Sequence, residues 1–253
     1  MNPMEQFVVK PLPSFEQPLF NLGGHPIYFT NQAAFMWVVV LVATLFFLFT
    51  ASRKRLVPTR GQSMAEISYE FVLGMINSTM GKDGLKFLPF IFALFMFILF
   101  SNFFGLVPYT FTVTSQIAVT FALTVLVMGM VVVVGFAKHG LGFLKLFVPV
   151  APWYLQIFLT PIEVISFLTR LVSLSVRLFA NMLAGHTMLQ VFAAFVVSLG
   201  FAGGLLSALS ITPFFMILFI MSLELLIAFL QAYVFAILSC IYLNEALHLH
   251  ESN

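Results

Sequence analysis

Long apolar segments, separated by short polar ones, dominate the pattern of this chain. Residues 32–52, 86–138, 155–199 and 205–249 are almost entirely apolar, and each is at least as long as the roughly 20 helical residues that cross a bilayer. Only 8% of the 253 residues are charged, whereas a soluble domain carries about 25%. The pattern therefore predicts an all-α, polytopic membrane protein.

Clusters of cations orient the first span. The cations that follow residues 32–52 within a few positions are Arg53, Lys54, Arg55 and Arg60. Basic residues gather on the cytoplasmic side of a membrane, so we expect residues 1–31 to lie outside the cytoplasm. That arm is rich in proline and lacks the apolar run of a signal peptide, and we interpret it as an extended part of the mature protein.

Residues 62–80 have a different, helical periodicity. Their apolar stripe consists of Met64, Ile67, Phe71 and Met75. Such a stripe predicts an amphipathic helix that lies on the cytoplasmic surface and does not cross the membrane. Ser63 and Glu66 have the spacing of a capping box, which predicts that the helix starts there.

Residues 86–138 are too long for one span and contain no charge between their terminal lysines. They predict a hairpin of two spans, with its turn at Asn102, Gly105 and Pro108. Lysines at both ends put those ends on the cytoplasmic side. Glycines and prolines in residues 139–154 predict a cytoplasmic connector.

Residues 155–199 and 205–249 leave two interpretations open. A helix of about 45 residues is about 65 Å long, whereas the hydrocarbon core is about 30 Å thick. Each segment is either two short spans with a turn, which in the first segment would lie near residues 177–185, or one long, strongly tilted helix. Turn signals near residues 177–185 are weak, so we favour two long, near-horizontal helices that form a hairpin.

Isolated ionisable residues lie in these two segments. Glu163, Arg170 and Arg177 are spaced seven residues apart and share one helix face, while Ser173 and Asn181 flank Arg177 by four residues. His186 points to nearly the opposite side. In the last helix, Glu224 and Gln231 are also seven residues apart.

A charge at the bilayer centre costs about 2.5–3.5 kcal/mol or more, so such residues favour an ion or proton pathway. Glu224 and His186 can bind and release protons, whereas Arg177 stays protonated and can only act as a barrier. A buried structural network is the alternative. For Glu163 and Arg170, an interfacial ion pair explains the residues equally well, and we expect Glu245, His248 and His250 to be solvated tail residues.

At this point the chain shows a family resemblance. Three motifs carry it: SxxVRLFANMLAGH, which contains Arg177, the turn SNFFGLVPYTFTVTSQI, and the C-terminal QAYVFAILSCIYLNEA. These motifs resemble subunit a (subunit 6) of the rotary ATP synthase membrane sector. The resemblance extends over nearly the whole chain. Many bacterial members carry Glu at the His186 position and His at the Glu224 position, and this chain has the exchanged pair, as mitochondria and their bacterial relatives do.

The resemblance implies a proton-translocating stator subunit with two half-channels against a ring of c subunits. By position, Arg177 would face the ring carboxylate. The outer half-channel would be lined by Asn181, His186, Glu224 and Gln231. The residues towards the cytoplasmic exit would be Glu163, Ser166, Arg170 and Ser173.

The same resemblance implies further properties of the subunit. Its partners would be the c-ring, peripheral-stalk b-type subunits and the lipid bilayer, with no nucleic acid, cofactor or metal and no catalytic residue of its own. We expect a bacterial inner membrane, or less readily a mitochondrial one, with the C-terminus cytoplasmic.

Other function classes fit the sequence less well. A secondary ion-coupled transporter with a midplane site would favour inverted repeats, which the sequence does not display. An intramembrane hydrolase would need a motif such as HExxH or GxSxG, and neither occurs. A structural scaffold would tolerate neutral replacements of Arg177 and Glu224.

Overall fold

The computed structural model describes residues 8–9, 11, 20–22, 25–51, 59–107, 110–140, 142–143, 152–204 and 209–248. Five helical stretches in this part of the chain are long and apolar enough to cross a membrane, which confirms the predicted class. The chain packs as two compact units. One comprises Met1–Leu48, Phe97–Gln116 and Leu178–Gln231, and the other Phe49–Met96, Ile117–Arg177 and Ala232–Asn253.

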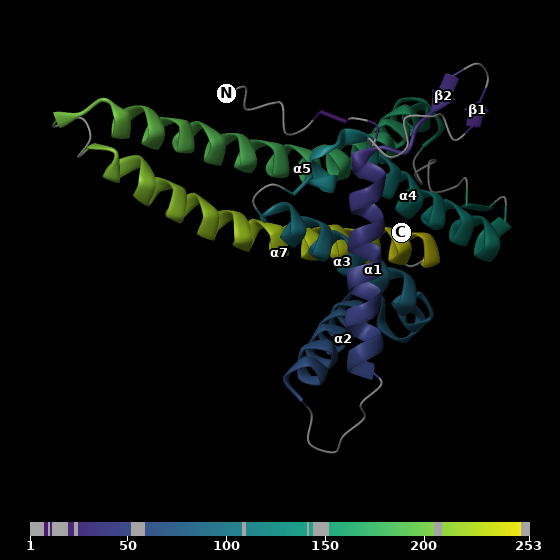
Figure 1. Ribbon diagram of the computed structural model, residues 1–253. Coiled ribbons are helices and arrows are strands. Elements are labelled where there is room, and N and C mark those ends of the chain that lie inside the picture. Colours follow the sequence, from purple (N-terminus) through teal and green to yellow (C-terminus); the bar gives the residue numbers. More distant parts are fainter. Residues whose placement is uncertain are drawn as a thin grey trace. The chain divides into compact units, whose positions relative to one another are not determined.

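Figure 1 shows the helices and one small β-hairpin. The α-helices are α1 Asn31–Ala51, α2 Arg60–Met80, α3 Leu88–Gly105, α4 Ile117–His139, α5 Trp153–Phe201 and α7 Ile211–Leu247, and the short 3-10 helices are η3 Gly81–Phe87 and η4 Val113–Ser115. The strands β1 Phe20–Leu22 and β2 His25–Ile27 pair in antiparallel fashion, with Phe20 opposite Ile27. The N-terminal arm, predicted to be extended, thus contains a short hairpin.

Helix α2 begins earlier than its sequence pattern predicts. Thr59 is its N-cap, and the Thr59 hydroxyl accepts a hydrogen bond from the Gln62 backbone N–H at 3.5 Å. The predicted capping box of Ser63 and Glu66 is therefore wrong. Ser63 already lies inside the helix, and the Glu66 carboxylate accepts a hydrogen bond from the Gln62 side chain at 2.8 Å. Thr59, four residues before Ser63, supplies the same kind of capping oxygen.

The apolar stripe predicted for α2 is only partly packed. The buried residues of this helix are Val72, Met75, Ile76 and Met80. Met64 and Ile67, near its N-terminal end, stay more than half exposed, at 61% and 64%. The C-terminal half of α2 therefore belongs to the core of its unit, and the N-terminal half presents an apolar face to the surroundings.

The segment predicted as a hairpin, residues 86–138, contains the two helices α3 and α4. Helix α3 ends at Gly105, and α4 begins at Ile117 after the short helix η4. The Thr110 hydroxyl donates to the Phe104 carbonyl, which satisfies one of the terminal carbonyls of α3. The predicted turn residue Pro108 and most of the predicted connector lie outside the described residues.

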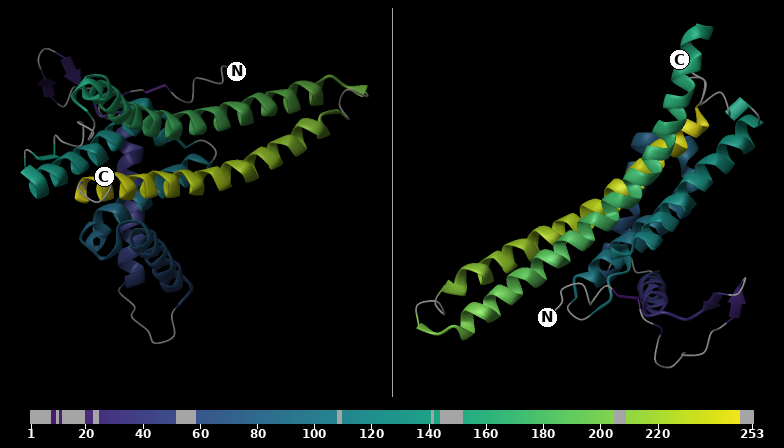
Figure 2. Two further views of the ribbon diagram at one scale, coloured as in Figure 1. Left: turned by 180° about the vertical axis from the view of Figure 1, so that it is seen from behind. Right: turned by 90° about the horizontal axis from the view of Figure 1, so that it is seen from above.

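Helices α5 and α7 are continuous over 49 and 37 residues. The alternative of a turn near residues 177–185 is therefore wrong. The second long segment was expected to start at residue 205, but α7 starts at Ile211, and residues 205–208 lie outside the described residues. At 1.5 Å per residue, α5 is about 73 Å long and α7 about 55 Å. In the first unit, the C-terminal part of α5 and the N-terminal part of α7 run side by side in opposite directions (Figures 1 and 2).

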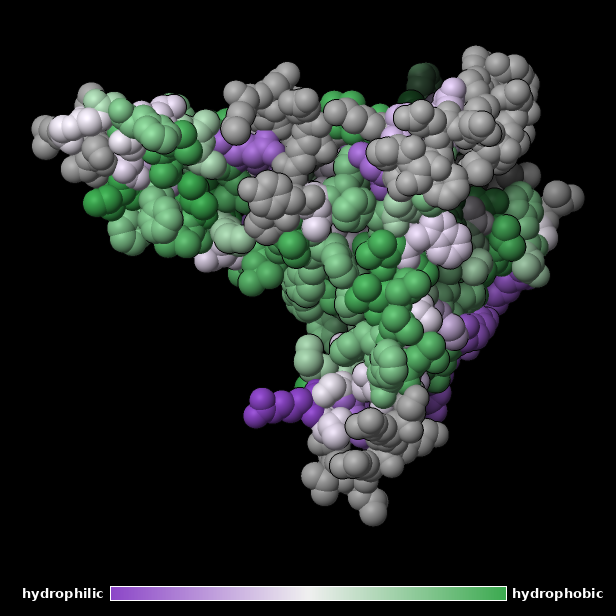
Figure 3. Space-filling model, viewed as in Figure 1, coloured by the Kyte–Doolittle hydropathy of each residue, from purple (hydrophilic) through white to green (hydrophobic). Residues whose placement is uncertain are grey.

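The surface of both long helices is apolar. Phe158 and Phe201 on α5 are 73% and 89% exposed, and Phe215 on α7 is 64% exposed. Figure 3 shows hydrophobic side chains over much of the visible face of these helices. Soluble monomers rarely expose contiguous apolar surface on this scale, so the solvent of this surface is lipid or another apolar protein surface.

One close contact in the second unit depends on a glycine. A Cβ built on Gly135 of α4 would lie 2.2 Å from two ring atoms of Phe143. Phe143 is almost fully buried, and its ring centroid is 5.1 Å from that of Phe136. We expect Gly135→Ala to lower stability by about 1–3 kcal/mol, because the ring has little room to move.

Thermal unfolding of the purified protein in detergent measures this loss. The matched control is Gly129→Ala on the same helix, where no atom lies within 4 Å of the added Cβ. Equal unfolding midpoints for the two variants would contradict the packing described for Gly135.

Candidate functional site

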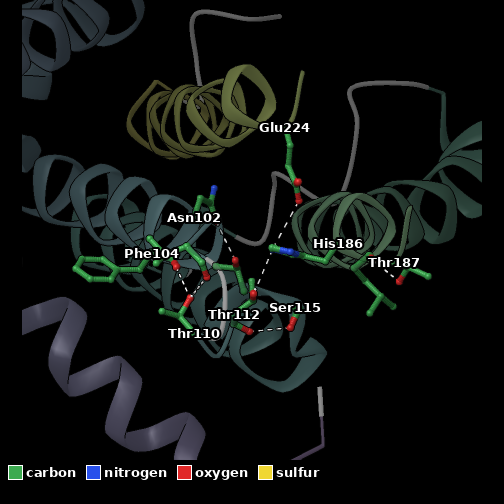
Figure 4. Close-up of polar contacts among 11 residues, drawn as sticks. Asn102, Phe104, Thr110, Thr112, Ser115, His186, Thr187 and Glu224 are labelled. Atoms are coloured by element: carbon green, nitrogen blue, oxygen red, sulfur yellow. Dashed lines mark hydrogen bonds and ion pairs between the residues drawn. The ribbon is translucent and has the colours of Figure 1, made fainter. Parts of the chain in front are cut away.

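His186 on α5 and Glu224 on α7 meet in the interior of the first unit. His186 Nε2 lies 3.6 Å from Glu224 Oε1, and the two residues are only 7% and 3% exposed. Figure 4 shows the two side chains pointing towards each other from neighbouring helices. Their residue types predicted that each can bind and release protons, but no sequence pattern predicted that they are in contact.

The Glu224 carboxyl group is buried without hydrogen bonds. Neither of its oxygens has a hydrogen-bond partner among the described residues. A buried carboxylate without donors is strongly disfavoured unless it is protonated or paired with a cation. The only group within ion-pair distance in the described chain is the His186 ring, so this pair can share or exchange a proton.

Gly185 makes room for the Glu224 carboxyl group. A Cβ at Gly185 would lie 2.7 Å from Glu224 Oε1 and 3.0 Å from its Cδ. The glycine next to His186 thus brings the α5 backbone close to the end of the Glu224 side chain. A larger residue at this position would displace the carboxyl group from the imidazole.

Buried polar side chains from the end of α3 and from the segment after it lie beside the pair. Thr112 Oγ1 lies 3.2 Å from His186 Nε2. The Thr114 hydroxyl donates to Asn102 Oδ1 at 2.9 Å, and the Asn102 amide donates to the Ala228 carbonyl on α7 at 3.0 Å. Figure 4 shows Thr112 near the His186 ring and Asn102 between Thr112 and α7.

Sequence reasoning missed this network. Asn102 was interpreted only as a turn residue, and Thr112 was not singled out. The available signal was the dense run of hydroxyl and amide side chains in residues 110–116, between two apolar helices. Polar groups at membrane depth need partners within the protein, so such a run indicates a buried polar site.

Gln231 and Asn181 lie on the same two helices as the pair. Gln231 is buried, at 7% exposure, and Asn181 is half-buried. No hydrogen bond or ion pair joins either residue to His186 or Glu224 in the part of the chain that the structure describes. Their assignment to a half-channel remains a prediction.

The second unit contains Arg177, Ser173 and Glu163. Arg177 and Ser173 are exposed, and Glu163 is half-buried. Among the described residues, Arg177 forms no ion pair with a carboxylate. A permanently charged side chain on an exposed apolar helix calls for a partner outside the chain.

Arg170 and Glu245 form an ion pair within the second unit, and the Arg170 guanidinium lies 5.5 Å from the ring centroid of Tyr242. The expectation that Glu245 is merely solvated is therefore wrong, because folding brings the end of α7 against α5.

His248 was also expected to be solvated, but it bonds the Asn244 side chain at 2.9 Å and lies 3.5 Å from Asp83. His250 lies outside the described residues.

Comparisons with known proteins now identify the family. A family model described as ATP synthase A chain matches residues 33–244. The chain belongs to this family. "ATP synthase subunit a" of Mesorhizobium japonicum is 54% identical over 250 residues, which cover 98% of this chain and 97% of that protein. "ATP synthase subunit a 1" of Brucella anthropi is 55% identical over 229 residues, covering 90% and 92%.

A third relative, "ATP synthase subunit a" of Chelativorans sp., is 54% identical over 248 residues, which cover 98% of each chain. Together with the five apolar helices, these relationships identify a multi-pass, proton-translocating subunit of the ATP synthase membrane sector. They do not favour the alternative of a secondary transporter.

The space at Gly185 provides a test of the site. We expect Gly185→Ala to reduce proton conduction about tenfold, because the new methyl group displaces the Glu224 carboxyl from His186 and weakens a contact of the size of one hydrogen bond. Stability should change little, since the group that must move is the end of a flexible side chain.

Passive proton conduction through reconstituted membrane sectors measures this effect. Gly200→Ala on the same helix is the matched control, because no atom lies within 4 Å of its added Cβ. Equal conduction by the two variants would show that the position of the Glu224 carboxyl is unimportant.

Proposed function

We propose that this chain is the stator subunit that carries protons through two aqueous half-channels, both of which end at the ring of c subunits. Arg177 separates the half-channels, the His186–Glu224 pair serves the outer one, and Glu163 and Ser173 serve the cytoplasmic one. The subunit makes and breaks no bond of ATP, which is left to other parts of the complex. The observation that carries the proposal is an exposed Arg177 without an ion-pair partner among the described residues.

The face of α5 around Arg177 suits a packed helical partner. A shallow pocket on this face is lined by Ile165, Leu168, Thr169, Val172, Ser173 and Val176. The small residues Thr169 and Ser173 in this lining allow the close approach on which helices rely in membranes, where packing and not water exclusion drives association. A c-subunit helix with one carboxyl group fits such a face, because the carboxylate would pair with Arg177.

Arg177 then acts through its fixed charge. An arginine cannot release its proton in a protein, so it cannot pass protons between the half-channels. It can stabilise a ring carboxylate that has just ionised. When the next carboxyl group becomes protonated, the neutral form can leave Arg177 and enter lipid at a far lower cost than the anion.

The buried His186–Glu224 pair is suited to deliver that proton. The imidazole and the carboxyl group can each bind and release protons, and their 3.6 Å separation allows an exchange after a small movement. We propose that Asn181 and Gln231 hold water on this route, since their amides bond water without titrating.

On the cytoplasmic side, the Arg170–Glu245 pair supports the half-channel from α5 and α7. This pair neutralises both charges, which leaves Glu163 and Ser173 as the groups that can meet protons leaving the ring. Each charge that crosses the full membrane potential carries about 2.3 kcal/mol per 100 mV. That free energy biases the ring to turn in one direction.

The lengths of α5 and α7 fit this arrangement if both helices are strongly tilted. Each is longer than the roughly 30 Å hydrocarbon core, and a near-horizontal helix presents a long apolar face to a neighbouring ring. We propose an N-terminus outside the cytoplasm, a cytoplasmic C-terminus, a bacterial inner membrane and contact with b-type stalk subunits. The cations next to α1 and at both ends of residues 86–138 support this orientation.

Replacing the fixed charge tests the proposal. We expect Arg177→Ala to abolish ATP synthesis and ATP-driven proton pumping while vesicles become passively leaky to protons, because nothing then separates the half-channels. The measurements are pumping and passive proton flux in vesicles that contain the reconstituted complex.

Arg60→Ala is the matched control, because Arg60 is an exposed arginine at the start of α2 and is not among the residues assigned to the proposed path. It should pump normally. Normal pumping by Arg177→Ala would overturn the proposed division of roles.

A further inference from the structure

We propose that Thr112 is a positioning residue for His186, and that its hydroxyl group keeps Nε2 hydrogen-bonded in both protonation states of the ring. The inference rests on the proposed function, since it assigns a third member to the proton-exchanging pair. It concerns a residue of the segment between α3 and α4, which reaches the pair from outside the two long helices.

Two side chains, those of Thr112 and Glu224, lie close to the same ring nitrogen of His186. His186 Nε2 lies 3.2 Å from Thr112 Oγ1 and 3.6 Å from Glu224 Oε1. All three residues are buried, with Thr112 only 1% exposed. The Thr112 hydroxyl and the Glu224 carboxyl group can therefore both contact Nε2, and the hydroxyl is the closer of the two.

A hydroxyl group suits this position because it can both donate and accept. When His186 is protonated, Nε2–H donates to Thr112 Oγ1 or to Glu224. When the proton passes from Nε2 to Glu224 Oε1, the imidazolium becomes a neutral ring with its remaining hydrogen on Nδ1, and the carboxylate becomes a neutral acid. The Thr112 O–H can then rotate and donate to the bare Nε2, so that the nitrogen is not left unsatisfied.

The surrounding structure holds Thr112 in place. The Ser115 hydroxyl donates to the Thr112 carbonyl at 2.7 Å. On the other side, a Cβ at Gly105 would lie 2.7 Å from Thr112 Cγ2, so the end of α3 packs directly against this side chain. Both contacts restrict the backbone and side chain that carry the hydroxyl group.

The same segment is tied to the helix that carries Glu224. Thr114 donates to Asn102, and Asn102 donates to the Ala228 carbonyl, one turn after Glu224 on α7. These buried bonds tie the segment that carries Thr112 to α7, the helix that carries Glu224. Buried polar networks of this kind hold their members in one geometry when every member is satisfied.

The first experiment compares Thr112→Val with Thr112→Ser in reconstituted complexes. Valine has nearly the shape of threonine but no hydroxyl group, and serine restores the hydroxyl. We expect passive proton conduction to fall about tenfold with valine, the effect of one lost hydrogen bond, and to recover with serine. The matched control is Thr124→Val, because Thr124 is equally buried but its hydroxyl donates to the Thr120 carbonyl of its own helix.

The second experiment measures the NMR signals of the His186 ring nitrogens directly. Complexes with ¹⁵N-labelled histidine would be examined by solid-state NMR, and the His186 signals would be those lost in His186→Gln. We expect Thr112→Val to shift the Nε2 signal and the balance between the ring tautomers, whereas Thr112→Ser and Thr124→Val leave them as in the unchanged chain. A merely structural role for Thr112 would not move these signals selectively.

The outcomes separate the inference from the function on which it rests. Normal conduction by Thr112→Val, or an unchanged Nε2 signal, would overturn the role of Thr112 while leaving the His186–Glu224 path intact. Normal conduction by His186→Gln would instead overturn the proposed path. If Thr112→Val does not assemble, Thr112→Ala replaces it, because alanine cannot clash, and equal conduction by the alanine and serine variants overturns the inference.

Discussion

The cost of a polar or charged group in hydrocarbon is the constraint on which this structure depends. Water is absent from the bilayer core, so each such group needs a partner within the protein or at an interface. The first unit meets this need around His186, whose Nε2 lies 3.2 Å from Thr112 Oγ1 and 3.6 Å from Glu224 Oε1. The second unit meets it with the Arg170–Glu245 ion pair.

Arg177 is the departure from this rule. It is exposed, permanently charged and without an ion-pair partner among the described residues. Glu224 is a milder departure, because its oxygens accept no hydrogen bond in the described chain. Unsatisfied groups of this kind are costly to stability, and proteins keep them where function requires a group that can change partners. In the proposed function, Arg177 is the fixed cation and Glu224 is the acid that binds and releases protons.

Much of the fold followed from local patterns. The apolar runs predicted the membrane class, and weak turn chemistry near residues 177–185 predicted that α5 continues through Arg177. Errors arose where two local signals competed. Thr59 and Ser63 both offer a capping oxygen, and the helix uses the earlier one. Glu245 was predicted to be solvated from its place near the chain end, but Arg170, 75 residues away, pairs with it.

The sequence by itself determined which residues can carry charge or protons and that their solvent is lipid, since residue type and apolar length are local properties. Only the tertiary structure decided which of them meet. His186 and Glu224 are 38 residues apart, Thr112 is 74 residues from His186, and no periodicity spans such separations. Their contacts depend on how α5 packs against α7 and on the space left by Gly185. Neither is a property of any one segment.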